Sequence, residues 1–470
     1  MTVSALFRPP APAPLTPLRS LLRVVRQGDG DLLSLVPRAA YTEPLTWLGW
    51  SRRSILLVND AQLCREVLHD ADGIFPKNDL MVGALEGLVG DSVFVSSGDR
   101  WRRQRRMIDP AFSQLRIRTA FVAMRAAVDA AEQRLDEAVA NERTPSLDLT
   151  MSHLAADVIC RTIFTTSLDS SVAQEVFDDF LLFERSVASV DLVQLIVGKP
   201  WARIAQPAPV VAACARIRRH IGDLLDPRLA ERARGEAGPD DIVGAILDAR
   251  DPDTGRPFDR EELIDQIGVF FLAGHETTAS VLTWTFFILA EQPDLVERAR
   301  AEIEAVSAGG AIEFEHIKRL GFLRNLFRET LRLYPPITFL PRVAERATRI
   351  GPRRVKRGAM IMISPWTAHR NGTLWRDADR FDPDRFDEAD GDGHGVPMAF
   401  GLGPRVCIGA GFATAEAILI LARLIRRYDL EALDAGKVRP VARLTTRPAD
   451  EIRCRIRHAA GIDAAAPVER

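Results

Sequence analysis

The sequence predicts a mainly α-helical protein with small β-sheets. Three features of the 470-residue chain support this fold class. Residues 115–245 show a series of helical patterns separated by short breaks, and residues 259–291 show one long stretch of helical apolar periodicity. Short runs typical of β-strands occur at residues 54–59 and 353–364. Helices are therefore expected to make up most of the structure.

The chain begins with a proline-rich segment. Five prolines lie within residues 1–17, and prolines this dense exclude a membrane-spanning helix there. We expect residues 1–49 to lead into a single domain over residues 50–455, with a C-terminal tail at 456–470. Residues 54–59 are expected to form a strand, and residues 60–69 a helix with Asp60 as its N-cap.

The next part of the chain is expected to be a loop followed by a short basic helix. Residues 80–97 are rich in glycine and predict an irregular segment. Asp99 is a candidate N-cap for the helix that follows. Trp101 and Arg105 are four residues apart and therefore share one face of it. Three further arginines are expected to face outward, where they could dock an acidic partner: Arg102, Arg103 and Arg106.

The long helix at residues 259–291 has an unusual centre. Asp259 and Glu262 make a capping box, and Pro293 marks the end of the helix. The helix is apolar nearly all round, which predicts burial, yet residues 274–278 read Gly-His-Glu-Thr-Thr. Local bonds from threonine hydroxyls to carbonyls one turn earlier would explain these polar groups. An acid–alcohol pair, Glu276 and Thr277, beside a bound ligand would also explain them.

Two charged elements follow. Residues 316–334 predict a helix ended by two prolines, and Glu329 and Arg332 are three residues apart on it, close enough to pair. Residues 353–364 predict a strand or hairpin. Further on, residues 381–386 read Phe-Asp-Pro-Asp-Arg-Phe and place Arg385 in a loop.

A glycine-rich decapeptide, Phe-Gly-Leu-Gly-Pro-Arg-Val-Cys-Ile-Gly at residues 400–409, precedes a helical run at residues 413–426. Its glycines permit tight backbone turns around Cys407. A helix N-terminus favours negative charge, so this turn suits a thiolate, and Arg405 could meet a second anion. The two interpretations are a buried structural cysteine and a ligand of a metal cofactor.

Composition narrows the possible functions. The net charge of −2 gives no reason to expect nucleic acid as a partner. The five cysteines are scattered, which indicates neither a zinc site nor a disulfide scaffold and fits a reducing cytosol.

Four of these motifs together resemble the cytochrome P-450 family. They are the decapeptide with Cys407, the Trp-x-x-x-Arg pair of Trp101 and Arg105, the Ala-Gly-His-Glu-Thr-Thr segment at residues 273–278, and Glu-x-x-Arg with the later Phe-Asp-Pro-Asp-Arg-Phe loop. The resemblance implies a cytochrome P-450 fold, with haem b held between the long central helix and the cysteine loop.

The resemblance also implies a role for each matching residue. Cys407 would be the axial thiolate ligand of the haem iron. Thr277, Glu276 and Gly274 would be catalytic, because they would handle dioxygen and its protons. The expected haem contacts are Trp101, Arg105, Arg342, Phe400, Gly401, Arg405 and Gly409. The expected substrate pocket is Ala273, Ile337 and Phe339, and the expected structural network is Glu329, Arg332 and Arg385. Trp366 and His369 are expected near the haem edge, and His275 receives no role.

The implied activity is that of a haem-thiolate monooxygenase. It would insert one oxygen atom of O2 into an apolar small molecule by hydroxylation or epoxidation. Electrons would come from NAD(P)H through ferredoxin reductase and ferredoxin, or a comparable donor. A cytoplasmic monomer without an integral membrane anchor is expected. The alternatives are a peroxide-driven peroxygenase and a non-catalytic haem-binding sensor. The sequence leaves fatty acid, terpene and aromatic substrates open.

Overall fold

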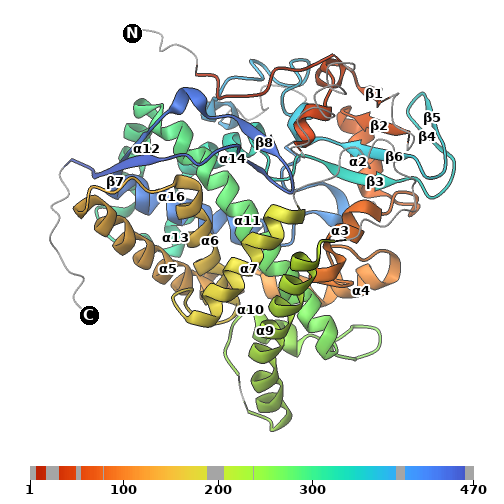
Figure 1. The fold of residues 1–470 in the computed structure, drawn as a ribbon, viewed down its shortest axis with the longest axis horizontal. Helices are drawn as coiled ribbons and strands as arrows, with labels where there is room; N and C mark the ends of the chain where they lie inside the picture. Colours follow the sequence, from red (N-terminus) through yellow and green to blue (C-terminus); the bar gives the residue numbers. More distant parts are fainter. Residues whose placement is uncertain are drawn as a thin grey trace.

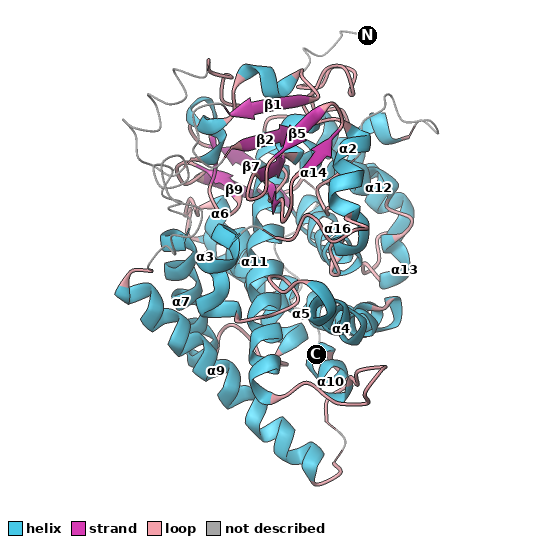
Figure 2. Cartoon of the chain, turned by 90° about the vertical axis from the view of Figure 1, so that its right-hand side faces the viewer, coloured by secondary structure: helices cyan, strands magenta, loops and turns pink. Residues whose placement is uncertain are grey.

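The computed structural model describes residues 7–16, 31–48, 54–77, 79–187, 206–236, 238–387 and 397–460. Helices fill most of it, and the strands gather toward one side (Figures 1 and 2). The predicted fold class, mainly α with small sheets, is confirmed. Within the described ranges, no helix combines the length and the apolar character needed to cross a membrane.

The helices have the following bounds: α2 Ala61–His69, α3 Asp79–Val89, α4 Gly98–Ile108, α5 Gln114–Ala140, α6 Leu147–Ile163, α7 Ser171–Val187, α9 Ala208–Ala233, α10 Ile242–Asp248, α11 Arg260–Ala290, α12 Pro293–Ser307, α13 Phe314–Ile317, α14 Gly321–Leu333, α15 Pro365–Ala368 and α16 Ala410–Arg427.

The strands have the following bounds: β1 Leu45–Leu48, β2 Ile55–Val58, β3 Leu340–Val343, β4 Thr348–Ile350, β5 Arg353–Val355, β6 Met360–Ile363, β7 Tyr428–Ala432, β8 Pro440–Ala442, β9 Thr446–Pro448 and β10 Cys454–His458. Four of them form one sheet in the order β1-β2-β6-β3, in which β2 and β6 are parallel and the other pairs antiparallel. The pairs β4/β5, β7/β10 and β8/β9 form two-stranded sheets.

Helix α11 is the centre of the molecule. It crosses the helical body in Figure 1 and packs against α3, α6, α9, α14 and α16. The capping box predicted at its start is present, because the Asp259 side chain accepts from the Glu262 N–H and the Glu262 side chain accepts from the Asp259 N–H. Most of the helix is buried all round, as its apolar sequence predicts.

Several local expectations are wrong. Residues 79–89, part of the segment expected to be irregular, form helix α3 despite Gly83 and Gly87, since Leu85 and Leu88 bury an apolar face. Helix α4 begins at Gly98 after Ser97, and Asp99 pairs with Arg102 instead of capping the helix.

Two other predicted elements are divided. The helix expected at residues 316–334 is two helices, α13 and α14, separated before Gly321. The hairpin considered at residues 353–364 does not form: β5 pairs with β4, while β6 joins the large sheet between β2 and β3. Periodicity in one segment did not reveal these partners, because strand pairing depends on residues distant in sequence.

Candidate active site

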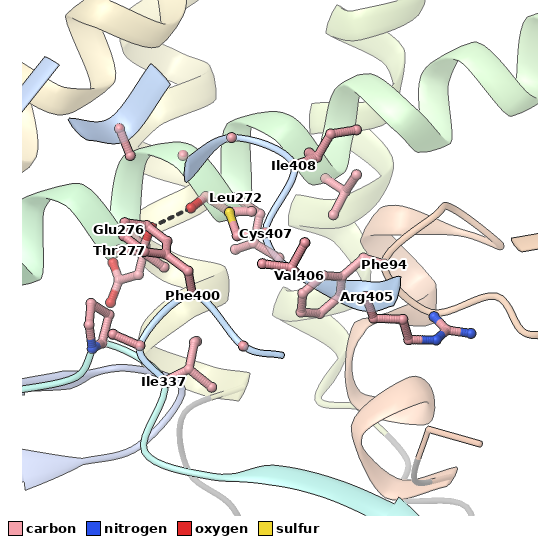
Figure 3. Close-up of a pocket in the computed structure, with 18 of the residues that line it drawn as sticks. Phe94, Leu272, Glu276, Thr277, Ile337, Phe400, Arg405, Val406, Cys407 and Ile408 are labelled. Carbon is pink, nitrogen blue, oxygen red and sulfur yellow. Dashed lines mark hydrogen bonds between the residues drawn. The ribbon is translucent and has the colours of Figure 1, made fainter. Parts of the chain in front are cut away.

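A cavity lies between the middle of α11 and the loop before α16 (Figure 3). It holds about 1960 Å³ of space not occupied by protein atoms, part of it open to solvent. Every haem-contact, catalytic and pocket residue expected from the sequence lines it: Trp101, Arg105, Ala273, Gly274, Glu276, Thr277, Ile337, Phe339, Arg342, Phe400, Gly401, Arg405, Cys407 and Gly409. Segments more than 300 residues apart are thus brought to one site.

The loop that carries Cys407 is held by its own backbone. The Cys407 N–H donates to the Phe400 carbonyl at 2.8 Å, and the Gly401 N–H donates to the Met398 carbonyl at 2.8 Å. Gly401 and Gly403 have φ values of +77° and +70°, which side chains disfavour. A Cβ on Gly403 would also lie 2.8 Å from the Leu68 carbonyl at the end of α2. The loop therefore needs glycine at residue 403 for both conformation and packing.

Cys407 differs from the other cysteines. Cys64, Cys160, Cys214 and Cys454 are buried in the core, whereas the Cys407 sulfur lies in the cavity wall. Burial raises the pKa of the Cys407 thiol, although the Gly409 N–H and Arg105 act in the opposite direction. A metal ion on this sulfur would reverse that preference, because coordination deprotonates a thiol.

One end of the cavity is cationic. Lys77, Arg105, Arg342 and Arg405 all line it. Burial lowers the pKa of Arg342 to about 10, and burial together with Arg342 lowers that of Arg405 to about 10. The pKa of Lys77 is held well below its usual value by burial and by the two nearby arginines. Like charges gathered in a poorly hydrated place need an anionic partner.

Contacts at this end leave room for such a partner. Arg405 stacks over Trp101 at 4.3 Å, and its Nη2 donates to the Ser96 carbonyl at 2.8 Å. Its Nη1 is buried and makes no hydrogen bond in the described part of the chain. Arg105 bridges Asp109 and the Val406 carbonyl. A cofactor with carboxylate groups fits this end, and its metal fits the Cys407 sulfur.

The α11 wall is polar at only a few points. The Thr277 hydroxyl donates to the Ala273 carbonyl at 2.6 Å, so the local bonding considered from the sequence is present. Gly274 faces the cavity, and a Cβ there would lie 2.6 Å from the end of the Ile159 side chain of α6, which would have to move. Glu276 accepts hydrogen bonds from the Thr445 hydroxyl and from Arg447. Its carboxylate is therefore held from the C-terminal part of the chain.

Sequence reasoning missed two charged residues of the cavity. Lys77 is a single lysine in a loop, and no motif marked it. Glu416 is fully buried on α16, and its Oε2 accepts from the Thr278 hydroxyl at 3.4 Å. Burial raises the pKa of Glu416 well above its usual value, a shift that the Thr278 bond opposes. The available signal was a glutamate within the apolar run of α16.

The charged network expected below the site is assembled and buried. Glu329 accepts from Arg332 at 2.7 and 2.8 Å and from Arg385 at 2.9 Å. Arg332 also donates to the carbonyls of His369 and Ala378. The Glu329 and Arg332 side chains are at most 1% exposed, so these charges depend on one another.

Some residues lie elsewhere than expected. Trp366 and His369 are buried outside the cavity, where Trp366 donates to the Tyr41 hydroxyl and His369 contacts the Arg332 carbonyl and the Met398 N–H. Arg103 does not face outward freely, because it pairs with Glu262 at 2.6 Å.

The cytochrome P-450 family model matches residues 9–452. The chain belongs to the cytochrome P-450 family. A curated relative, the cyclooctat-9-en-7-ol 5-monooxygenase of Streptomyces melanosporofaciens, is 32% identical over 88% of this chain and 85% of its own. The pentalenene oxygenase of Streptomyces avermitilis is 30% identical over 84% and 86% of the two chains.

The same cytochrome P-450 fold is found in solved structures. The crystal structure of another cytochrome P-450 matches with a TM-score of 0.80 and 24% identity, covering 97% of this chain and 100% of that one. The haem domain of cytochrome P-450DA has a TM-score of 0.79 and 22% identity, covering 97% and 98%. This chain is therefore a cytochrome P-450 monooxygenase, an oxidoreductase with cysteine-thiolate haem.

Proposed function

We propose that this cytochrome P-450 inserts one oxygen atom of O2 into an apolar terpene-type substrate, with Cys407 as the haem ligand. The observation that carries the proposal is the cavity, which places the Cys407 sulfur and the Gly274–Thr277 segment around one space with otherwise mostly apolar walls. When bound, haem b supplies the iron chemistry that activates O2.

The surrounding residues would position the cofactor and handle protons. Lys77, Arg105, Arg342 and Arg405 would neutralise the haem propionates, and Trp101 would support Arg405 by stacking. Phe400, Gly401 and Gly409 would shape the loop around the ligand. Gly274 leaves space beside α11. Because the Thr277 hydroxyl donates to the Ala273 carbonyl, its Oγ1 would accept a hydrogen bond from a donor in the cavity. Glu276 would supply protons to the cavity.

The walls of the cavity and the bacterial relatives favour a terpene-type substrate. Phe94, Ile337 and Phe339 give the walls an apolar character, which suits a hydrocarbon skeleton. Two Streptomyces relatives are named for the oxidation of cyclooctat-9-en-7-ol and of pentalenene. Substrate choice does not follow from fold, so this assignment depends on those relatives and the apolar walls.

The cellular setting is also part of the proposal. We place residues 50–455 in one catalytic domain that acts as a monomer and receives electrons from NAD(P)H through ferredoxin reductase and ferredoxin. The five cysteines are all free, which suits the reducing cytoplasm.

The first experiment is the absorption spectrum of the reduced protein with carbon monoxide. We expect a strongly red-shifted Soret band for the natural chain and its loss in Cys407→Ala. Cys64→Ala, which removes a buried cysteine outside the cavity, is the matched control and should retain the band. A retained band in Cys407→Ala would show that another residue ligates the iron.

The substrate is tested by the spin-state shift of the ferric haem on titration. We expect a sesquiterpene hydrocarbon such as pentalenene to produce a saturable shift, and a fatty acid of equal carbon number to bind more weakly. The reverse order would overturn the terpene assignment. Turnover with hydrogen peroxide at rates equal to those with ferredoxin and its reductase would favour the peroxygenase alternative.

A further inference from the structure

Glu276 lies at one end of a buried polar cluster whose other members received no role from the sequence. We name the cluster Ser152, Glu184, His275, Glu276 and Arg447 the roof network. It joins α6, α7 and α11, which come together in Figure 1, to strand β9. His275 Nε2 lies 2.8 Å from the Ser152 hydroxyl, and Arg447 Nη2 lies 3.0 Å from Glu184. Arg447 also pairs with Glu276.

Two atoms of the roof network face each other without a hydrogen bond. Nδ1 of His275 and Oε1 of Glu184 are 3.3 Å apart, and both are buried and unbonded within the described residues. Buried polar groups of this kind need a partner. If both atoms presented lone pairs, they would repel. A proton held between His275 and Glu184 removes that repulsion.

The charges lead to the same conclusion. The network contains two carboxylates, Glu184 and Glu276, that are at most 4% exposed, and Arg447 contacts both. With neutral His275 these groups sum to −1, and with protonated His275 they sum to zero. A buried site favours the neutral sum. His153 of α6 is another titratable group on this side, and its tilted ring contacts Phe177, which also contacts His275.

The roof network also has the spacing of a proton path. The nearest ligand atoms of Glu184, His275 and Glu276 lie within 4.8 Å of one another. One water that makes two hydrogen bonds spans about 4.6 Å between its partners. Arg447 is one-third exposed, so solvent reaches the network there, while Glu276 lines the cavity at the other end. The cluster therefore connects solvent to the cavity.

We propose that the pair His275–Glu184 stores a proton and reloads Glu276, with Arg447 positioning both carboxylates. The pair passes its proton through a single water to the Glu276 carboxylate, and Glu276 delivers that proton to the cavity. The pair then regains a proton from solvent on the Arg447 side. Only N–H and O–H bonds form and break, and no electrons move. This inference rests on the proposed function, because it assigns the source of the proton that Glu276 delivers.

A divalent metal would be another occupant of this ligand set. Arg447 already contacts the carboxylates of Glu184 and Glu276 and supplies the positive charge that a metal would bring. The guanidinium and the stored proton account for the cluster without a metal ion.

The test combines spectroscopy with turnover. In the reduced, carbon-monoxide-bound enzyme, which is diamagnetic, ¹⁵N-histidine labelling reports the protonation of His275, assigned by its loss in His275→Gln. We expect both ring nitrogens of His275 to carry protons at neutral pH and the Nδ1 signal to shift in Glu184→Gln. We expect Glu184→Gln and His275→Gln to lower product formation by about tenfold or more and to increase peroxide release and the solvent isotope effect.

Matched variants separate relay from structure. Glu132→Gln removes the charge of another buried carboxylate, which lies on α5 and pairs with Arg423 of α16. It should leave the His275 signal and the coupling to product unchanged. Arg447→Lys keeps a positive charge and should recover coupling relative to Arg447→Met. The red-shifted Soret band and the substrate-induced spin shift should persist in every variant.

Each outcome decides between the two proposals. Normal coupling and isotope effects in Glu184→Gln and His275→Gln, with normal spectra, would overturn the relay. A His275 ring with a proton on only one nitrogen at neutral pH would do so as well. If His275→Gln does not fold, Glu184→Gln on α7 decides alone. Loss of the red-shifted band in the natural chain would instead contradict the proposed function.

Discussion

At the scale of single residues, two threonines of α11 make the same backbone hydrogen bond, but only one of them lines the cavity. The Thr277 hydroxyl donates its hydrogen bond to the Ala273 carbonyl, and Thr277 lies in the cavity wall. Thr283 makes the same bond to Ala279 at 2.8 Å but is buried and is not among the cavity-lining residues. Comparing substitutions at Thr277 and Thr283 therefore separates the loss of a hydrogen bond within the helix from the loss of a hydroxyl that takes part in proton delivery.

Thr277→Val should therefore uncouple the enzyme without unfolding it. We expect product formation to fall by about tenfold or more and peroxide release per electron pair to rise, because valine has no oxygen that can accept a hydrogen bond from the cavity. Thr283→Val should leave both quantities unchanged, and Thr277→Ser should restore coupling. The measurement is peroxide and product per NAD(P)H consumed. Unchanged coupling in Thr277→Val would remove this hydroxyl from proton handling.

Glu416 makes a pH-dependent contribution to stability. Burial raises its pKa in the folded protein, so the folded state keeps the proton while the unfolded state loses it above about pH 4.3. The contribution of Glu416 to the free energy of unfolding is fully present below the pKa of the unfolded state, and it decreases as the pH rises toward the pKa of Glu416 in the folded state. In Glu416→Gln the free energy of unfolding no longer shows this decrease, because glutamine does not ionise. We expect the free energy of unfolding of the variant relative to the natural chain to rise by about 1.4 kcal/mol per pH unit in that window.

Urea unfolding followed by circular dichroism between pH 5 and pH 8 measures this difference. A difference that does not change with pH would mean that Glu416 is ionised in the folded protein.

At the scale of elements, α4 connects the cavity to the surface. One face carries Trp101 and Arg105 into the cavity. Arg103 ties α4 to the start of α11 through Glu262. Arg102 and Arg106 are 61% and 48% exposed and pair with Asp99 and Asp253. The outward charge is thus smaller than the sequence suggests, because local acids offset part of it.

Arg102→Gln together with Arg106→Gln tests whether this face docks ferredoxin. We expect the KM for ferredoxin to rise several-fold and its dependence on salt to weaken, because surface charges act on association. Peroxide-supported rates should stay constant. Stability should change by less than about 1 kcal/mol, since these pairs are exposed. Equal losses in both assays would show that the face does not contact the electron donor.

At the scale of the whole molecule, one buried network ties α14 to the segment before the cysteine loop. The expected triad has one carboxylate, Glu329, which accepts hydrogen bonds from both arginines, Arg332 and Arg385. Arg332 further holds carbonyls at residues 369, 378 and 380. If Glu329 lost its negative charge, the positive charges of Arg332 and Arg385 would stay buried without the carboxylate that balances them.

Glu329→Gln should destabilise the protein by about 3–5 kcal/mol and reduce haem retention. Asp384→Asn is the control, since Asp384 lies in the same short helix as Arg385, η4 (Pro383–Phe386), but pairs with Arg298 at the surface. It should cost less than about 1 kcal/mol. Urea midpoints and the haem-to-protein ratio provide the comparison. Similar losses in the two variants would mean that burial does not amplify the Glu329 network.

The sequence by itself determined the fold class, the central helix with its capping box and the loop around Cys407. These features are local: apolar periodicity, caps and glycine conformations depend on residues a few positions apart. The same locality explains the errors, because glycines concealed helix α3 and position alone misplaced Trp366 and His369. Only the tertiary structure brought Lys77, Glu416, Glu184 and Arg447 to the cavity and to Glu276. Their partners lie tens to hundreds of residues away, so no local pattern showed which charges would meet in a poorly hydrated place, where a charge needs a partner.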